Sequence, residues 1–207
     1  MEEEQEVLYI PSVELFGNWY HLQEFLKNRG NPTYSIGGDL DLRYTQIKTF
    51  GNLISVDGDL NLVGSEIRSL GILTSVGSDL MLDKSKIKTL GNLTSVGGSL
   101  YMGKNEIDSL GNLTTIGDYL DLIESKISSL GNLTSVGGSF DSNKKLSSLG
   151  NLISVDGFLD LRDTPISSLG NLTYVGGSLD LRRTPLSKKM TAKEIREKVE
   201  IGGALHL

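Results

Sequence analysis

A unit of 20 residues repeats through most of this chain, and this repeat constrains the fold more than any other feature. Its consensus is L-x-L-x-x-[TSN]-x-I-x-S-L-G-N-L-T-S-V-G-G-x. Successive units start 20 residues apart, except for one step of 19 residues after Phe140. The opening triplets start at Leu40, Leu60, Leu80, Leu100, Leu120, Phe140, Leu159 and Leu179. A repeat of this length is typical of a solenoid, in which each coil stacks on its neighbours around one shared core.

Each unit combines a short strand with an arc. The triplet L-x-L alternates apolar and polar positions, which is the period of a strand whose leucines face inward. The apolar residues that follow recur in steps of three, as at Ile87, Leu90, Leu93 and Val96. A step of three favours a tight 3₁₀-like or extended arc over a full α-helix. Stacked L-x-L segments predict one parallel sheet, with the Gly-Asn and Gly-Gly pairs as bends.

The repeat resembles the leucine-rich repeat. The motif V-x-x-x-L-x-L-x-x-[TSN]-x-I is similar to the L-x-x-L-x-L-x-x-N-x-L core of that superfamily, over about residues 36–207. Stretches such as LTSVGGSLYM also resemble receptor L-domain repeats, and the short unit is similar to those of bacterial and phage leucine-rich-repeat proteins. The resemblance implies a β-solenoid of the leucine-rich-repeat type, with a parallel sheet, short arcs and small helical caps. The alternative architecture is a more symmetrical parallel β-helix.

Caps are expected at both ends, because an open solenoid end exposes apolar core. Residues 1–35 form the predicted N-terminal cap, with a helix over about 19–28 that Asn18 caps. We also expect a short edge strand over 7–10. The aromatic residues of this segment are expected in the core of the cap rather than in a ligand site: Phe16, Trp19 and Tyr20.

Residues 36–189 form the predicted solenoid of about eight coils, and residues 190–207 form the C-terminal cap. Thr191 and Glu194 have the spacing of a capping box, which predicts a short helix to about Val199. The last seven residues, IGGALHL, match the earlier segment IGGDLDL in residue type. We expect them to form a final strand at the edge of the sheet, where an unpaired edge can bind another chain.

The composition argues against several classes of function. The chain has no cysteine, and its two histidines, His21 and His206, lie far apart in the repeat register. It contains no nucleophile–histidine set, no G-x-x-x-x-G-K-[ST] loop and no H-E-x-x-H motif, so we expect neither catalysis nor a cofactor. A net charge of −6 argues against a nucleic acid partner. No apolar run reaches the ~18 residues of a membrane span and no signal peptide is visible, which predicts a cytoplasmic protein that does not bind membranes.

Two polar columns run along the predicted coils. Asp39, Asp59 and Asp79 stack at about 4.7–4.9 Å spacing, where they can bind Ca²⁺ or accept hydrogen bonds from backbone N–H groups. The second alternative is favoured, and we assign no metal ligand. The Ser, Thr and Asn residues at the bracketed consensus position are expected to bond turn backbone between coils.

The variable outward positions form the candidate binding surface, because the fixed positions of a solenoid build its core. Large apolar side chains gather near the middle of this surface, and an acid–arginine mixture follows them. Aromatic residues and Met inside a polar rim are typical of a protein-binding patch. The alternative is that neighbouring aromatic side chains only cover one another across the sheet. The predicted protein-binding residues are Val63, Met81, Tyr101, Tyr119, Asp121, Ile123, Phe158, Asp160, Arg162 and Arg182.

These observations predict a non-enzymatic protein–protein interaction module that binds an unknown protein through its sheet face. The resemblance to small bacterial and phage repeat proteins implies an adaptor or an inhibitor. The alternative is a structural protein that self-associates through the edges of its solenoid. In that case a homo-oligomer would form through the C-terminal edge strand, IGGALHL.

Overall fold

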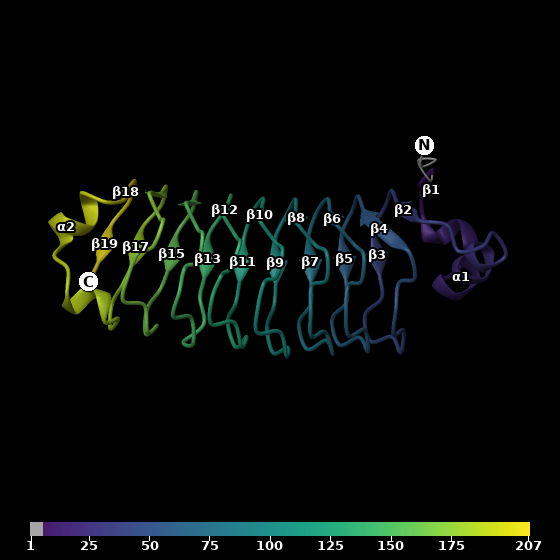
Figure 1. The fold of residues 1–207 in the computed structure, drawn as a ribbon, viewed down its shortest axis with the longest axis horizontal. Coiled ribbons are helices and arrows are strands. Elements are labelled where there is room, and N and C mark those ends of the chain that lie inside the picture. The colour runs from purple at the N-terminus through teal and green to yellow at the C-terminus, as the bar shows by residue number, and fades with distance from the viewer. Residues whose placement is uncertain (1–5) are drawn as a thin grey trace, which may run out of the picture.

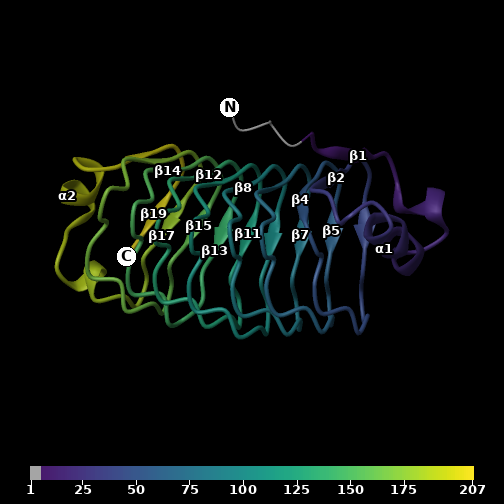
Figure 2. The same ribbon diagram turned by 45° about the vertical axis from the view of Figure 1, so that its right-hand side comes forward.

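Residues 6–207 form a parallel β-solenoid in the computed structural model (Figure 1). Residues 1–5, which include the start of the predicted N-terminal cap, lie outside the described residues. The coils stack along one long axis, with a helical segment at each end (Figures 1 and 2). The prediction of a solenoid with short arcs and small helical caps is confirmed.

Two parallel sheets run along the solenoid, where the sequence analysis expects one. Sheet B contains the L-x segments that were expected to pair, and sheet A contains the Ser-Val segments of the arcs. Equivalent residues of successive coils pair directly, as Leu100 does with Leu120 and Val96 with Ile116. Of the two predicted forms of the arc, 3₁₀-like and extended, the structure has the extended one. The β-branched residues of the arcs can therefore form strands that pair between coils.

Over residues 6–207, sheet A has ten strands in the order β1 (Leu8–Ile10), β2 (Tyr34–Ile36), β4 (Leu53–Val56), β6 (Ser75–Val76), β8 (Ser95–Val96), β10 (Thr115–Ile116), β12 (Ser135–Val136), β14 (Ser154–Val155), β16 (Tyr174–Val175) and β18 (Glu200–Ile201). In the same described part of the chain, sheet B has nine strands in the order β3 (Leu40–Asp41), β5 (Leu60–Asn61), β7 (Leu80–Met81), β9 (Leu100–Tyr101), β11 (Leu120–Asp121), β13 (Phe140–Asp141), β15 (Leu159–Asp160), β17 (Leu179–Asp180) and β19 (Leu205–His206).

The core is a set of apolar columns enclosed by the coils. Within one coil, Ile107, Leu110, Leu113 and Ile116 are all buried, and their equivalents in other coils stack on them. Since the conformational entropy of 20 residues costs about 1–2 kcal/mol each, one coil cannot order itself by burying so few side chains. Each coil is therefore stable only when it packs on its neighbours.

The shortened unit keeps the core continuous by two substitutions. Phe140 is fully buried in place of the usual leucine, while the half-buried Ser142 replaces the second inward leucine. Asn143 turns inward, where its Nδ2 donates hydrogen bonds of 2.9 Å to Ser125 Oγ and to the carbonyl oxygen of Ile127. A larger ring and a bonded amide thus compensate for the missing residue.

The column of Ser, Thr and Asn residues bonds mainly within its own coil, which corrects the expectation of bonds between coils. The hydroxyls of Thr45, Thr164 and Thr184 each donate to the carbonyl oxygen three residues earlier, at 2.7 Å. Asn105 Nδ2 makes the equivalent bond at 3.0 Å. The reason is geometric, because the tight turn after each sheet B strand brings the side chain back over its own backbone.

The N-terminal cap contains η1 (Val13–Phe16) and α1 (Trp19–Lys27). Asn18 caps α1 as predicted, since its Oδ1 accepts a hydrogen bond from the His21 N–H at 3.0 Å. The Trp19 ring is buried and packs edge-on against Phe50, with ring centroids 6.0 Å apart. The predicted edge strand is confirmed, because β1 pairs in parallel with β2.

Tyr20 is the exception to the predicted aromatic core of this cap. Its side chain is 63% exposed, whereas the half-buried Phe16 packs on Phe25 at a centroid distance of 4.7 Å. Consecutive residues of a helix point about 100° apart, so Tyr20 faces solvent when its neighbour Trp19 faces the core.

In the last coil, η2 (Leu186–Lys188) and α2 (Ala192–Arg196) replace the usual turn, and α2 lies in the predicted C-terminal cap. The capping box is confirmed, because the Glu194 carboxylate accepts from the Thr191 N–H at 2.8 Å and Thr191 Oγ1 accepts from the Glu194 N–H. The helix ends three residues before the predicted Val199, which is buried in the turn that follows. The predicted final strand is β19, which ends sheet B beside β17.

Candidate functional site

The predicted site residues lie on the outer face of sheet B, which we call the sheet B face. Side chains alternate along each strand, so the residues on either side of an inward leucine point outward together. Five of the apolar residues are half-buried, and the side chain of Ile123 is 48% exposed. The five are Val63, Met81, Tyr101, Tyr119 and Phe158. The face therefore carries apolar surface that its neighbours cover only in part.

Met81 and the two tyrosines Tyr101 and Tyr119 form one cluster on this face, which we call the aromatic centre. Met81 pairs with Tyr101 across strands β7 and β9, and the Tyr101 and Tyr119 rings lie 5.9 Å apart at 60°. Asn61 Nδ2 contacts Met81 Sδ at 3.3 Å. Phe158 lies two coils further on and, among the described residues, makes no ring contact with this centre. The structure thus brings together the middle of the predicted patch and separates Phe158 from it.

Carboxylates surround the aromatic centre. Asp121 pairs with Tyr101 on one side and with Asp141 on the other. Burial and the negative charges of Asp83 and Asp141 raise the pKa of Asp121 above its ordinary value. The Tyr119 hydroxyl donates a hydrogen bond to the Asp141 carboxylate. Burial, this bond and the nearby acidic charges hold the pKa of Tyr119 above its usual range, so Tyr119 remains a neutral donor.

The C-terminal part of the sheet B face is an ion-pair network. Arg162 Nη2 lies 2.5 Å from Asp160 Oδ2, and its Nε lies 3.5 Å from Asp180 Oδ2. Arg182 Nη2 lies 2.5 Å from the same Asp180 oxygen. Burial pushes the pKa of Asp180 up, but the hydrogen bonds and charge of Arg182 outweigh burial and leave the pKa below its ordinary value. The predicted residues Asp160, Arg162 and Arg182 are therefore neutralised within this network, Arg162 mainly by Asp160 and Arg182 by Asp180.

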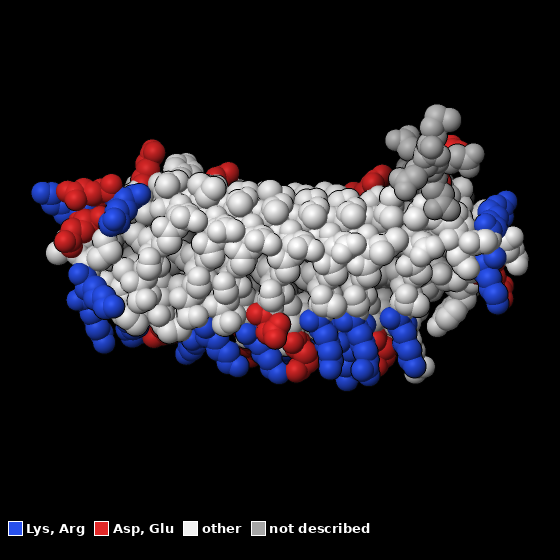
Figure 3. Space-filling view, viewed as in Figure 1, with Lys and Arg blue, Asp and Glu red and all other residues white. Residues whose placement is uncertain are grey.

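Basic residues have a fixed place in the repeat that the sequence analysis missed. Within residues 36–187, every lysine and arginine lies in the turn between a sheet B strand and the next glycine bend. These residues are Arg43, Lys48, Arg68, Lys84, Lys86, Lys88, Lys104, Lys126, Lys144, Lys145, Arg162, Arg182 and Arg183. Figure 3 shows lysine and arginine side chains along one long edge of the solenoid, with acidic side chains among them. The signal was present in the repeat register, because the basic residues always fall in the same segment of the unit, after the sheet B strand and before the next glycine bend.

A hollow of about 620 Å³ lies at the shortened coil, and sequence reasoning missed it as well. Lys144 and Lys145 of this coil line it together with Ile123 of the preceding coil and Asp163 of the following one. The coil is one residue shorter than its neighbours, so its turn spans a shorter path between them. The step of 19 residues marked the position, but the inward rotation of Asn143 could not be deduced from it.

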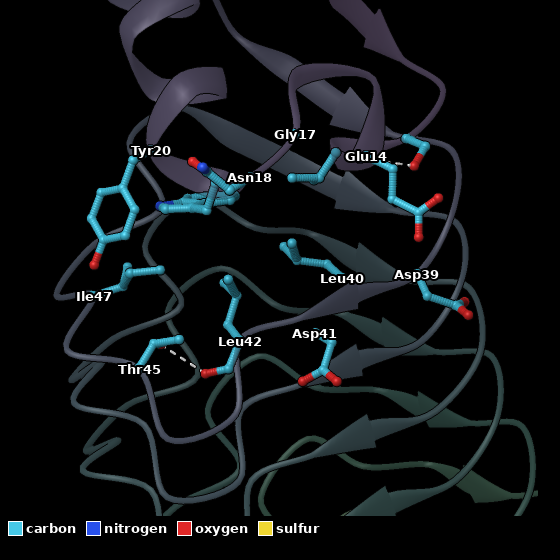
Figure 4. A pocket seen from close by; sticks show the side chains of 13 residues that line it. Glu14, Gly17, Asn18, Tyr20, Asp39, Leu40, Asp41, Leu42, Thr45 and Ile47 are labelled. Atoms are coloured by element: carbon cyan, nitrogen blue, oxygen red, sulfur yellow. Dashed lines mark hydrogen bonds between the residues drawn. The ribbon is translucent and has the colours of Figure 1, made fainter.

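A second hollow of about 590 Å³ separates the N-terminal cap from the first coil. Figure 4 shows Leu40, Leu42 and Ile47 beneath the cap segment that carries Asn18 and Tyr20. Sheet A continues past this coil through β1, whereas sheet B ends at β3. The cap therefore covers the end of the apolar core without pairing with the outer edge of β3.

The Asp39, Asp59 and Asp79 column forms a hydrogen-bond ladder, as the favoured alternative predicts. The Oδ1 atom of each residue accepts from the backbone N–H twenty positions later, at 2.9, 2.9 and 2.7 Å respectively. Each carboxylate therefore ties its coil to the next. Nowhere in residues 6–207 do three or more His, Cys, Asp or Glu side chains form a group that could hold a metal ion.

The fold defines this chain as a parallel β-solenoid repeat protein with an aromatic and acidic sheet face. Comparisons with protein-family models, curated proteins and solved structures give no match. The resemblance to leucine-rich repeats therefore stays a prediction from the residues. Across residues 6–207, no helix has the length and apolar character required to cross a bilayer.

Proposed function

We propose that this chain is a non-enzymatic protein-binding module, acting as an adaptor or an inhibitor, whose sheet B face contacts the partner. The aromatic centre of Met81, Tyr101 and Tyr119 is the observation that carries the proposal. Its side chains are half-buried, so they are held in place by neighbours and still offer surface. Large, pre-ordered aromatic side chains contribute most of the binding energy at many protein interfaces.

The charge of this face favours a protein partner. The carboxylates of Asp83, Asp121 and Asp141 surround the aromatic centre and would repel the phosphates of nucleic acid or of an anionic membrane. A chain without cysteine suits a reducing compartment, and we propose the cytoplasm as its site of action.

The test is partner capture from the native host, followed by mass spectrometry, with two variants. Changing Tyr101→Ala together with Tyr119→Ala should reduce capture at least tenfold, because the face loses both rings. The matched control changes Ile72→Ala together with Ile153→Ala, which removes exposed apolar groups away from sheet B. Equal loss in both variants, or loss in the control alone, would place the working surface elsewhere.

Self-association is the second candidate function, and the open sheet edges favour it. In the described chain, β3 and β19 end sheet B, while β1 and β18 end sheet A. An unpaired strand edge offers backbone donors and acceptors to another chain. A structural protein of this kind would sediment as an oligomer at micromolar concentration. A monomer at the highest soluble concentration would eliminate this candidate and leave the binding module unaffected.

A further inference from the structure

Three aspartates of sheet B hold an arginine from their own coil. Asp41, Asp160 and Asp180 are each followed two residues later by Arg43, Arg162 and Arg182. In each pair the arginine backbone N–H donates to Oδ1 of the aspartate at 2.9–3.1 Å. The guanidinium Nε and Nη2 atoms then contact both carboxylate oxygens at 2.5–3.1 Å. The fold thus shows three times how a guanidinium sits on this column.

Asp121 has the same turn but lacks the arginine. The Ile123 N–H donates to Asp121 Oδ1 at 2.8 Å, which matches the backbone bond of the three arginine-bearing turns. The Ile123 side chain is about half exposed and supplies no charge. Within residues 6–207, no lysine or arginine forms an ion pair with Asp121 or Asp141. The charge of Asp141 helps to raise the pKa of Arg162, but the ion pairs of Arg162 are with Asp160 and Asp180.

The surroundings of Asp121 are also those that a guanidinium prefers. Tyr101 lies beside it on β9, and Tyr119 stands two residues earlier on the same outward face. Asp83 contributes a second negative charge from across Gly103, where its Oδ1 accepts a hydrogen bond from the Gly103 N–H at 2.9 Å and lies in the space that a Cβ would take. Planar guanidinium groups stack on aromatic rings and bind carboxylates through two parallel hydrogen bonds. Negative charge and ring surface therefore coincide at this point of the face.

We propose that Asp121, Asp83, Tyr101 and Tyr119 form a receptor site for an arginine side chain of the partner protein. This inference rests on the proposed function and names the chemistry of the partner's anchor. The guanidinium takes the position on Asp121 that Arg162 takes on Asp160, and one tyrosine ring covers its face. Lysine fits less well, because its ammonium group cannot bind both carboxylate oxygens in one plane.

The experiment is a titration of the ¹⁵N-labelled full chain with the peptide acetyl-Gly-Arg-Gly-amide, followed by NMR. We expect saturable shifts at the amides of residues 121 and 123, with a Kd of about 1–10 mM for one exposed side chain. The same peptide with citrulline in place of arginine should produce no saturable shift. The lysine peptide should bind at least threefold more weakly.

Three variants test where the guanidinium binds. Ile123→Arg supplies the missing guanidinium from within the coil, so it should abolish binding of the arginine peptide at Asp121. Ile123→Met is the matched control, because its side chain is long but has neither charge nor N–H donor, so the arginine peptide should bind as it does to the wild type. In the opposite direction, Arg162→Gln vacates Asp160, so new saturable shifts should appear around residue 160.

Several outcomes would overturn the proposal. These are no saturable shift in the wild type, equal binding of the citrulline peptide, or unchanged binding by the Ile123→Arg variant. The partner-capture experiment shows whether the arginine site or the proposed binding function is wrong. If capture depends on Tyr101 and Tyr119 but not on Ile123→Arg, the face is correct and the arginine anchor is wrong. If the arginine peptide binds but partner capture is unchanged in the Tyr101→Ala, Tyr119→Ala variant, the proposed function is wrong.

Discussion

Removing one buried hydroxyl should stabilise this protein. Within the described residues, the hydroxyls of Ser65 and Ser85 are buried without a hydrogen-bond partner. Their side chains are 0% and 4% exposed, so water does not reach them from the surface. Mutational data place the cost of a buried, unpaired polar group at about 1–3 kcal/mol. The change Ser85→Ala removes this cost and leaves the backbone of the turn unchanged.

The expected magnitude follows from two opposing effects. Loss of the oxygen relieves about 1–3 kcal/mol of desolvation, while the void it leaves, smaller than a methyl group, costs up to about 1 kcal/mol. We therefore expect the Ser85→Ala variant to gain about 1 kcal/mol in free energy of unfolding. For a chain of this size the melting temperature should rise by about 2–4 °C.

The assay is urea unfolding followed by circular dichroism, with a thermal melt alongside it. The matched variant is Thr164→Val, which keeps the shape but removes a hydroxyl that donates to the Leu161 carbonyl oxygen at 2.7 Å. It should lose about 1 kcal/mol. An unchanged slope against urea would show that only stability has changed. If Ser85→Ala destabilises as much as Thr164→Val, the Ser85 hydroxyl has a partner and the reasoning fails.

Three further predictions follow from the caps and the charges. Arg182→Ala should cost about 1–2 kcal/mol in the free energy of unfolding by urea, because Asp180 loses its closest ion pair and keeps the longer one to Arg162 and the backbone hydrogen bond from residue 182. An unchanged midpoint would refute this. Deleting residues 1–30 should cause aggregation in light scattering, because it uncovers the core of the first coil; a soluble variant that melts as before would contradict it. Folding raises the pKa of Asp121. The neutral Asp121 carboxyl therefore contributes fully to stability when the pH is below its pKa in the unfolded chain, about 3.9, and this contribution is lost as the pH rises through its pKa in the folded protein. Asp121→Asn should therefore unfold like the wild type near pH 3.5 and at a higher urea concentration at pH 7, and the opposite order at pH 7 would show that the charge is stabilised.

Local signals explain which parts of the fold could be predicted. The capping residues Asn18 and Thr191 act within three or four positions, so their helices could be read from the sequence. The strands of sheet B were visible because two inward leucines mark each one. Sheet A was missed because its strands are as short as Ser95–Val96, and a single inward valine does not distinguish a strand from an irregular arc. Its existence depends on hydrogen bonds to residues 20 positions away.

The candidate site shows the same division. Alternation along the strand correctly placed Tyr101, Asp121 and Arg162 outward, because side-chain direction is a local property. The bond from Tyr119 to Asp141 could not be predicted, because it joins outward positions of adjacent coils that differ in register by two residues. The repeat did contain enough information to find the arginines that follow aspartates at an interval of two. The pattern points to a site at Asp121 only when the structure shows that Ile123 stands in the turn where Arg43, Arg162 and Arg182 stand in their coils.

The two candidate functions need not exclude one another. At the N-terminal end, the cap lies over the first coil, so pairing with the outer edge of β3 would require the cap to move. At the C-terminal end, β19 is open, and two copies can pair there by a two-fold axis. Asp121 lies four strands from β19, or about 19 Å at the usual strand spacing. Such a dimer would leave both arginine sites free and would bind a partner with two anchors more tightly than one site can. Sedimentation of the Ile123→Arg variant decides this point, since a change in oligomeric state would mean that the sheet B face itself joins the copies.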